Sequence, residues 1–249
     1  MATREFQIVH SGERTNAAGK PVSNKILLSI PDREYYSIRP HLDFVDLPNH
    51  RNLYEPVHTL KFVHFPNRGL VSLVVPMEDG KTVEAGVVGN EGMSGIPLAV
   101  GIRRSPLREI VQIGGDGFRV TTTAFQNILQ SAPRLRTALN RFAVLQGLQV
   151  AQTAACNRLH EIEQRLARWL LMAQDRIDAG LLLITHDFLA TMLGTDRPSV
   201  SVAAGTLQRR KLIEYTRGSV KVLNRKKLEG FVCECYGIIQ QFNGDIGLR

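Results

Sequence analysis

The chain has 249 residues, of which 43% are hydrophobic and 22% charged, a composition typical of one large globular domain or two modest ones. No apolar run approaches the ~18 residues of a membrane-spanning helix, and the N-terminus lacks the apolar stretch of a signal peptide. We therefore expect a cytoplasmic protein without a membrane partner, and its net charge of +8 favours a polyanionic one.

The N-terminal half changes from polar to strand-like. Residues 1–23 are rich in Gly, Ser and Asn and are expected to form a flexible leader. A short helical piece is predicted over 24–40, and short β-prone runs separated by turns such as 78–81 follow from residue 42 to 120. This pattern is typical of a β-barrel or β-roll, and we expect the glycines of 114–117 to interrupt its last strands.

A long helix is predicted over residues 132–159, because Pro133 suits a first helical turn and only Gly147 interrupts the run. A heptad-like seam follows it: Leu135, Ala138, Phe142, Leu145 and Leu159, continued by Gln149, Gln152 and Cys156. Such a seam either covers the roll or pairs with a second copy of the chain.

Two short helical patterns within residues 185–205 meet at Gly194, the spacing of a helix-turn-helix. Thr185 and Asp196 are expected to cap the two helices, Gly194 to adopt a left-handed conformation, and Pro198 to lie in the first turn of the second helix. A shared apolar core is predicted from Leu189, Ala190, Leu193, Val200 and Ala203.

Positive charge is concentrated between Arg197 and Lys227, from the second helix of this motif onward. The basic residues are Arg197, Arg209, Arg210, Lys211, Arg217, Lys221, Arg225, Lys226 and Lys227, and Glu214 is the one acid among them, so nine minus one gives +8 within this segment. Alternating runs over 212–215 and 219–223 predict a hairpin around Thr216-Arg217-Gly218. A helix-turn-helix followed by a basic hairpin is a winged helix, so double-stranded DNA is the expected partner; an ordinary helical hairpin is the alternative.

Local motifs accompany this order of elements: Leu53-Tyr54-Glu55-Pro56, Val63-His64-Phe65-Pro66, Gly69-Leu70-Val71-Ser72, Met77-Glu78-Asp79-Gly80 and Gly89-Asn90-Glu91-Gly92-Met93-Ser94-Gly95. With them the chain resembles the CRP/FNR superfamily of bacterial transcription regulators from residue 24 to 231. The resemblance implies an α+β fold with an N-terminal double-stranded, cyclic-nucleotide-binding-like β-roll, a long dimerisation helix and a C-terminal winged helix-turn-helix. The implied domains are a flexible leader (1–23), a sensory roll (24–131), a dimerisation helix (132–159) and a DNA-binding domain (160–249), with a hinge near Leu159-His160-Glu161.

The same resemblance implies a homodimeric transcription regulator that reads a two-fold-symmetric DNA site. RNA polymerase and a small-molecule effector at the roll are the further candidate partners. The candidate effector residues are Gly92, Ser94, Gly95, Arg104, Ser105, Val150 and Ala151. The cyclic-AMP-binding branch uses a ribose-binding Glu and an Arg-Ser/Thr-Ala sequence, but here the Glu is missing and Pro106 follows Arg104-Ser105. We therefore expect an unidentified effector, with a cyclic nucleotide as the alternative.

The candidate DNA-binding residues are Thr185, His186, Asp196, Arg197, Pro198, Ser199, Ser201, Val202, Arg209 and Arg217. Arg197 matches an Arg by which the family contacts DNA, whereas Pro198 and Val202 replace the Glu and Arg that often read cytosine and guanine, so a different target sequence is expected. Arg197, Ser199 and Ser201 are expected to face the groove, and Val202 to meet a thymine methyl group. Thr185, His186, Arg209 and Arg217 are expected to contact phosphate.

No catalytic or metal site and no cofactor are predicted. The roll histidines His41, His50, His58 and His64 form no His-x-His pair, so a β-roll metal enzyme is the weaker alternative function. An iron–sulfur cluster of the oxygen-sensing branch needs four thiolates, whereas this chain has three cysteines. Cys233 and Cys235, two residues apart in a predicted helix, are expected to point to different faces as packing or surface thiols.

Overall fold

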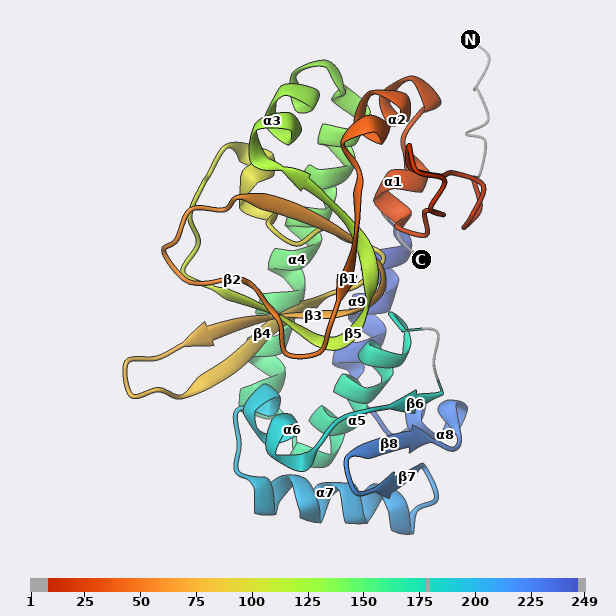
Figure 1. Cartoon of the computed structure of the whole chain (residues 1–249). Coiled ribbons are helices and arrows are strands. Elements are labelled where there is room, and N and C mark those ends of the chain that lie inside the picture. Colours follow the sequence, from red (N-terminus) through yellow and green to blue (C-terminus); the bar gives the residue numbers. More distant parts are fainter. Residues whose placement is uncertain (1–8, 178–179, 246–249) are drawn as a thin grey trace.

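The computed structural model describes residues 9–177 and 180–245, which form a sheet-rich lobe and a helical lobe joined by a long helix (Figure 1). The first lobe contains a five-stranded antiparallel sheet in the order β1-β5-β3-β4, with β2 paired to β5. The strands are β1 (Asp43–Leu47), β2 (Asn52–Tyr54), β3 (Phe62–Pro76), β4 (Thr82–Val88) and β5 (Arg108–Thr121), and the short helix η2 (Ile96–Val100) follows β4. The predicted N-terminal β domain is thus confirmed.

The strands β3 and β5 run unbroken along the sheet. The prediction that residues 114–117 interrupt the last strands is wrong, because Gly115 and Gly117 lie within β5 and allow its backbone to approach β3 closely. A Cβ atom at Gly115 would collide with the carbonyl oxygen of Arg68. Register shifts between Pro66 and Val71 accompany this approach and bend the pair of strands.

Short helices cover the sheet at the end of the lobe that lies uppermost in Figure 1. They are α1 (Lys25–Ser29), α2 (Asp32–Ile38), η1 (Arg39–His41) and α3 (Thr122–Ser131). Thr121 begins α3 by accepting a hydrogen bond from the backbone N–H of Ala124. The core beneath these helices includes Phe65, Phe118, Phe125 and Phe142, each at most 1% exposed.

The N-terminal segment packs against this lobe. Arg14 is buried, donates to the carbonyl oxygen of Leu27 at 2.6 Å and forms an ion pair with Asp32 at 2.6 Å. Asn16 donates through Nδ2 to the carbonyl oxygen of Leu42 at 2.9 Å. The prediction of a flexible leader is therefore wrong for residues 9–23, because polar side chains bind backbone carbonyls that composition does not reveal; residues 1–8 lie outside the described part.

The long helix α4 (Pro133–Leu159) connects the two lobes. Its buried side recurs every three or four residues: Leu135, Leu139, Phe142, Leu145, Gln146, Gln149, Thr153 and Cys156. Much of the seam predicted from the sequence thus belongs to this internal face, and Ala138 packs against the same core. Leu159 is the exception, with 74% of its surface exposed. For most of these residues the covering alternative is correct.

The second lobe begins after a break at His160 and Glu161, whose backbones are extended. Its elements are α5 (Ile162–Gln174), β6 (Leu181–Leu182), α6 (His186–Leu193), α7 (Arg197–Arg209), β7 (Ile213–Thr216), β8 (Ser219–Val222), α8 (Arg225–Glu229) and α9 (Glu234–Asp245). The strands form a small sheet in the order β6-β8-β7. Leu70, Val74 and Val87 of the roll belong to the hydrophobic core of this lobe, so the two lobes share packing.

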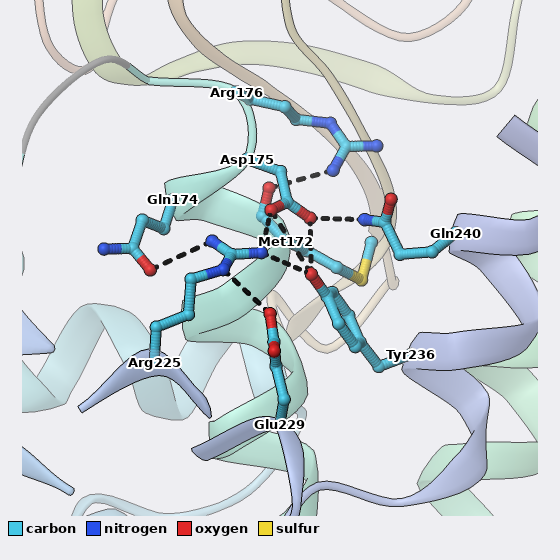
Figure 2. Close-up of polar contacts among 8 residues, drawn as sticks. All are labelled: Met172, Gln174, Asp175, Arg176, Arg225, Glu229, Tyr236 and Gln240. Carbon is cyan, nitrogen blue, oxygen red and sulfur yellow. Dashed lines mark hydrogen bonds and ion pairs between the residues drawn. The ribbon is translucent and has the colours of Figure 1, made fainter. Parts of the chain in front are cut away.

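The last helix, α9, folds back against α5 and α4. Asp175, at the end of α5, accepts hydrogen bonds from Arg225 at 2.5 Å, from Tyr236 at 3.1 Å and from Gln240 (Figure 2). These bonds hold α9 against the C-terminal end of α5. None of the described helices is long and apolar enough to cross a membrane.

Candidate nucleic-acid interface

Local sequence signals fix both helices of the motif. Thr185 caps α6 by accepting from Phe188 N–H at 3.3 Å, and Asp196 caps α7 by accepting from Ser199 N–H at 2.7 Å. Gly194 lies between the helices with φ +60°, and Pro198 occupies the first turn of α7. These features are those that the sequence predicts for a helix-turn-helix.

Packing of α6 on α7 determines which side of α7 is free. Leu189, Leu193, Val200 and Ala203 are each at most 3% exposed, and Ala190 is buried at the crossing. The opposite side of α7 exposes Arg197, Pro198, Ser201, Val202 and Arg209. Val202 is 63% exposed although it is apolar. The free side therefore offers a hydroxyl, a methyl surface and two guanidinium groups.

His186 joins both helices to the wing. Its Nδ1 lies 2.9 Å from Ser201 Oγ, and its ring stacks on Tyr215 of β7 at 3.9 Å between centroids. Burial, with a smaller contribution from Arg197, lowers the pKa of His186 below its usual range. A neutral ring at pH 7 positions Ser201 and the wing but is a weak phosphate ligand.

Arg197 and Ser199 differ in their availability. The Nε of Arg197 lies 3.4 Å from Asp187, and both side chains are largely exposed, so the pair contributes little and can exchange for a DNA contact. Ser199 is half-buried and its backbone N–H is held by the Asp196 cap. Of the two, Arg197 is the residue that is free to reach a base or a phosphate.

The wing is the hairpin of β7 and β8, in which Ile213 pairs with Val222 and Thr216 with Ser219. Gly218 has φ +82° at the tip beside the exposed Arg217. Two of the nine basic residues between Arg197 and Lys227 point elsewhere: Arg225 binds Asp175 and Glu229 (Figure 2), and the Arg210 guanidinium lies 4.9 Å from the centroid of the Phe231 ring. The other seven are exposed: Arg197, Arg209, Lys211, Arg217, Lys221, Lys226 and Lys227.

A separate pocket of about 290 Å³ lies in the roll. Its lining comes from β2, the following loop and the facing parts of β3 and β5: Arg51, Asn52, Leu53, Tyr54, Glu55, His58, Thr59, Leu60, Lys61, Phe62, His64, Ser94, Glu109 and Arg119. Glu109 accepts hydrogen bonds from Ser94 Oγ and from Gly95 N–H, and burial raises its pKa. Burial also lowers the pKa of His64 to about 4, so its ring is neutral at pH 7.

The predicted effector residues do not form one site. Ser94 lines this pocket, Gly95 binds Glu109 beside it, and the Ser105 N–H donates to the lining residue Tyr54. Gly92 instead lies against Phe142, because a Cβ there would collide with the ring of that residue. Val150 lies near Gly86, while Arg104 and Ala151 are exposed. Sequence reasoning missed Arg51, Lys61 and Arg119 at the pocket.

Four further residues, which the sequence analysis did not group into one site, come together at the junction of the lobes. The ligand-type atoms of Cys156, His160, Cys233 and Cys235 all lie within 4.8 Å of one another. The prediction that Cys233 and Cys235 face different directions is wrong, because Cys233 precedes α9 and only Cys235 belongs to it. Two signals were available in the sequence: a Cys-x-x-x-His spacing at the end of a helix and a Cys-x-Cys spacing.

A winged helix-turn-helix with a free basic side, built onto a β-roll by a long helix, defines a DNA-binding transcription regulator. Residues 164–231 match the Crp-like helix-turn-helix domain. This domain covers the C-terminal lobe, and the chain as a whole shares the fold of solved regulators of the CRP/FNR family.

Several solved structures share the fold. FixK2 from Bradyrhizobium japonicum is 14% identical with a TM-score of 0.66, covering 77% of this chain and 98% of that one. The c-di-GMP responsive global regulator CLP from Xanthomonas campestris is 16% identical with a TM-score of 0.64, covering 78% and 100%. TTHA1359, a CRP/FNR-family regulator from Thermus thermophilus, is 20% identical with a TM-score of 0.61, covering 78% and 98%. No curated protein matches the sequence.

Proposed function

We propose that this regulator acts in the cytoplasm as a homodimer on a two-fold-symmetric DNA site, under the control of an effector bound at the roll. The observation that carries the proposal is the free side of α7, which exposes Arg197, Ser201 and Val202 while Val200, Ala203, Ala204 and Leu207 are buried. RNA polymerase is the further partner through which such a DNA complex would change transcription. We propose no catalytic role.

In the proposed complex, α7 enters the major groove. The N-terminal residues of a recognition helix contact base edges, so we expect Arg197 and Ser201 to hydrogen bond with bases and Val202 to contact a thymine methyl group. Arg209 and Arg217 extend the basic surface toward the phosphates on either side. Thr185 and Asp196 support this arrangement as helix caps, since their side-chain oxygens already accept backbone N–H groups.

An outward face of α4 supports dimerisation. Its exposed apolar residues are Val144, Leu148, Ala151, Ala155 and Leu159. Val144 is 65%, Leu148 41% and Leu159 74% exposed. Their spacing of three or four residues places them along one stripe of the helix, opposite the face that covers the roll. A second copy of α4 would bury this stripe and give the paired DNA-binding domains that a symmetric site requires.

Contacts between the lobes supply a route for effector control. Val83 of β4 lies against Gly194 at the turn between α6 and α7, since a Cβ there would be 2.9 Å from its Cγ2. The ring centroids of His50 and Phe188 are 5.2 Å apart. A molecule that binds the roll pocket more tightly in one arrangement of these contacts than in another would favour the first arrangement. It would thereby change the orientation of α7. The basic residues Arg51, Lys61 and Arg119 at the pocket favour an anionic effector.

The test is selection of binding sites from random duplex DNA by the purified chain at one fixed salt concentration, with and without cyclic AMP. We expect enrichment of a two-fold-symmetric sequence. If cyclic AMP changes the affinity of the chain for the enriched sequence, the effector is a cyclic nucleotide. An unchanged affinity would favour another anion as the effector. Absence of any enriched sequence under both conditions would contradict the proposed reading of DNA.

A further inference from the structure

Three cysteines and one histidine form a compact cluster beneath the DNA-binding domain. Cys156 and His160 lie one turn apart at the C-terminal end of α4. Cys233 immediately precedes α9, and Cys235 lies in its first turn. The three cysteines are each at most 3% exposed. Thus every cysteine of the chain, although Cys156 is far in sequence from the other two, contributes to one site.

The four atoms lie within 4.8 Å of one another, and two of the distances between them match those in the coordination shell of a single metal ion. Cys156 Sγ lies 3.6 Å from Cys233 Sγ, and Cys235 Sγ lies 3.5 Å from His160 Nδ1. Tetrahedral zinc, with Zn–S of about 2.3 Å and Zn–N of about 2.0–2.1 Å, separates two sulfur ligands by about 3.8 Å and a sulfur from a nitrogen by about 3.6 Å. An iron–sulfur cluster lies between its ligands and would hold them farther apart.

Neighbouring side chains make polar contacts with His160 and Cys235, as the residues around zinc ligands do in zinc proteins. The Nε2 of His160 lies 3.3 Å from a carboxylate oxygen of Glu234, which favours the tautomer whose Nδ1 lone pair faces the thiols. Gln152 donates through Nε2 to Cys235 Sγ at 3.1 Å. The buried guanidinium of Arg168 acts electrostatically on Cys156 and would offset the negative charge of three thiolates and one divalent ion.

We propose that Cys156, His160, Cys233 and Cys235 bind one zinc ion in a tetrahedral site with three sulfur ligands and one nitrogen ligand. Four protein ligands complete the shell and leave no position for substrate, which is the arrangement of a structural site. The ion joins the end of α4 to the start of α9, next to the break at His160 and Glu161. It therefore holds the junction between the long helix and the DNA-binding domain in one arrangement.

The first experiment is metal analysis of the untagged full-length chain, purified with a reductant that does not chelate. We expect one zinc ion per chain, released in step with the modification of three thiols by an organomercurial. Replacement by Co²⁺ should give the intense visible bands of a tetrahedral ion and the near-ultraviolet bands of thiolate ligation. None of these readouts uses DNA, so they stand independently of the proposed function.

Substitutions assign the ligands. Cys235→Ser and His160→Gln should each lower the zinc content at least about tenfold, whereas His41→Gln, at an exposed histidine away from the cluster, should keep one ion per chain. Glu234→Gln should keep the ion but increase its loss to a chelator by about 10–100-fold, the usual effect of removing a carboxylate behind a histidine ligand. If a cysteine variant does not fold, the cobalt spectrum of the unmodified chain still decides the question.

Three results would overturn the proposal. The first is a folded chain with three free thiols that takes up neither zinc nor cobalt. The second is iron with inorganic sulfide, which would make the site an iron–sulfur cluster. The third is a disulfide between Cys156 and Cys233 in protein purified without oxygen, because that bond would remove two ligands.

Discussion

The indole N–H of Trp169 in α5 donates a hydrogen bond of 2.9 Å to Glu84 in β4, and this bond joins the DNA-binding domain to the roll. The same carboxyl group accepts a hydrogen bond from Ser72. Glu84 is buried, and burial raises its pKa to about 7. A group that changes charge near neutral pH therefore lies at the contact between the two lobes.

The first prediction is a pH-dependent stability that comes from Glu84. Its pKa is near 7 in the folded chain, against an ordinary value of 4.5, so the folded state holds the proton more tightly. This contribution, about 3 kcal/mol at most, is fully present below the ordinary pKa and is lost as the pH rises through 7. Urea unfolding followed by Trp169 fluorescence should show the loss in the wild type between pH 5 and 8 and a smaller one in Glu84→Gln. Parallel pH profiles for the two proteins would show that Glu84 does not titrate there.

The second prediction separates base reading from phosphate binding. Arg197→Ala should weaken binding to the selected site by about 1–3 kcal/mol and relax its sequence preference if Arg197 contacts a base edge. Arg217→Ala at the wing should weaken binding to all sequences alike and reduce the dependence on salt by about one phosphate contact. Fluorescence anisotropy with specific and random duplexes measures both effects.

Arg33→Ala is the control for this pair, since it removes an exposed positive charge from α2, far in sequence from the motif. It should leave the sequence preference unchanged. Equal losses for Arg33→Ala and Arg197→Ala would mean that net charge, and not the surface of α7, determines the affinity.

The third prediction concerns the outward face of α4. Leu148→Glu places a charge in the middle of the exposed apolar stripe and should convert a dimer into a monomer, because burying an unpaired carboxylate between two helices is unfavourable. Val100→Glu, at an exposed apolar position at the end of η2, is the matched control and should leave the dimer intact. Light scattering coupled to size exclusion gives both masses; a dimer that survives Leu148→Glu would place the interface elsewhere.

The fourth prediction tests the turn between α6 and α7. Gly194→Ala should destabilise the chain by at least about 1–2 kcal/mol, because a side chain at positive φ is strained and its Cβ would also meet Val83 at 2.9 Å. Gly237→Ala, within α9 and with no atom within 4 Å of the added Cβ, should instead stabilise by about 0.5–1 kcal/mol. Thermal unfolding compares them; stabilisation by both changes would contradict the left-handed turn.

The features that could be predicted from the sequence are those that depend on near neighbours. Thr185, Gly194 and Asp196 each act on a group within three or four residues, so the helix-turn-helix can be recognised one residue at a time. The hairpin around Gly218 is local in the same sense. The strand limits of the wing differ from the prediction by one residue at both ends of β7 and at the C-terminal end of β8.

The features that could not be predicted depend on which helices, strands and segments pack against one another. The periodicity of α4 shows that one side is buried, but it does not say whether Leu135 and Phe142 face the roll or a second chain. The cluster of Cys156 with Cys233 required α9 to fold back onto α4, which the bonds of Asp175 make possible. The polar composition of the N-terminal segment likewise gave a wrong prediction. Arg14 and Asn16 are buried, and their side chains donate hydrogen bonds to backbone carbonyl oxygens.

The central claim is that a pair of these chains recognises DNA sequence through α7. The most direct test is an equilibrium titration of the selected duplex and of a scrambled duplex of equal length at one salt concentration. We predict two chains per selected duplex and binding at least about 10³-fold tighter than to the scrambled one, as is usual for specific sites. Equal affinities for both duplexes, falling in parallel as salt is added, would contradict the claim and leave only attraction between phosphate and a basic surface.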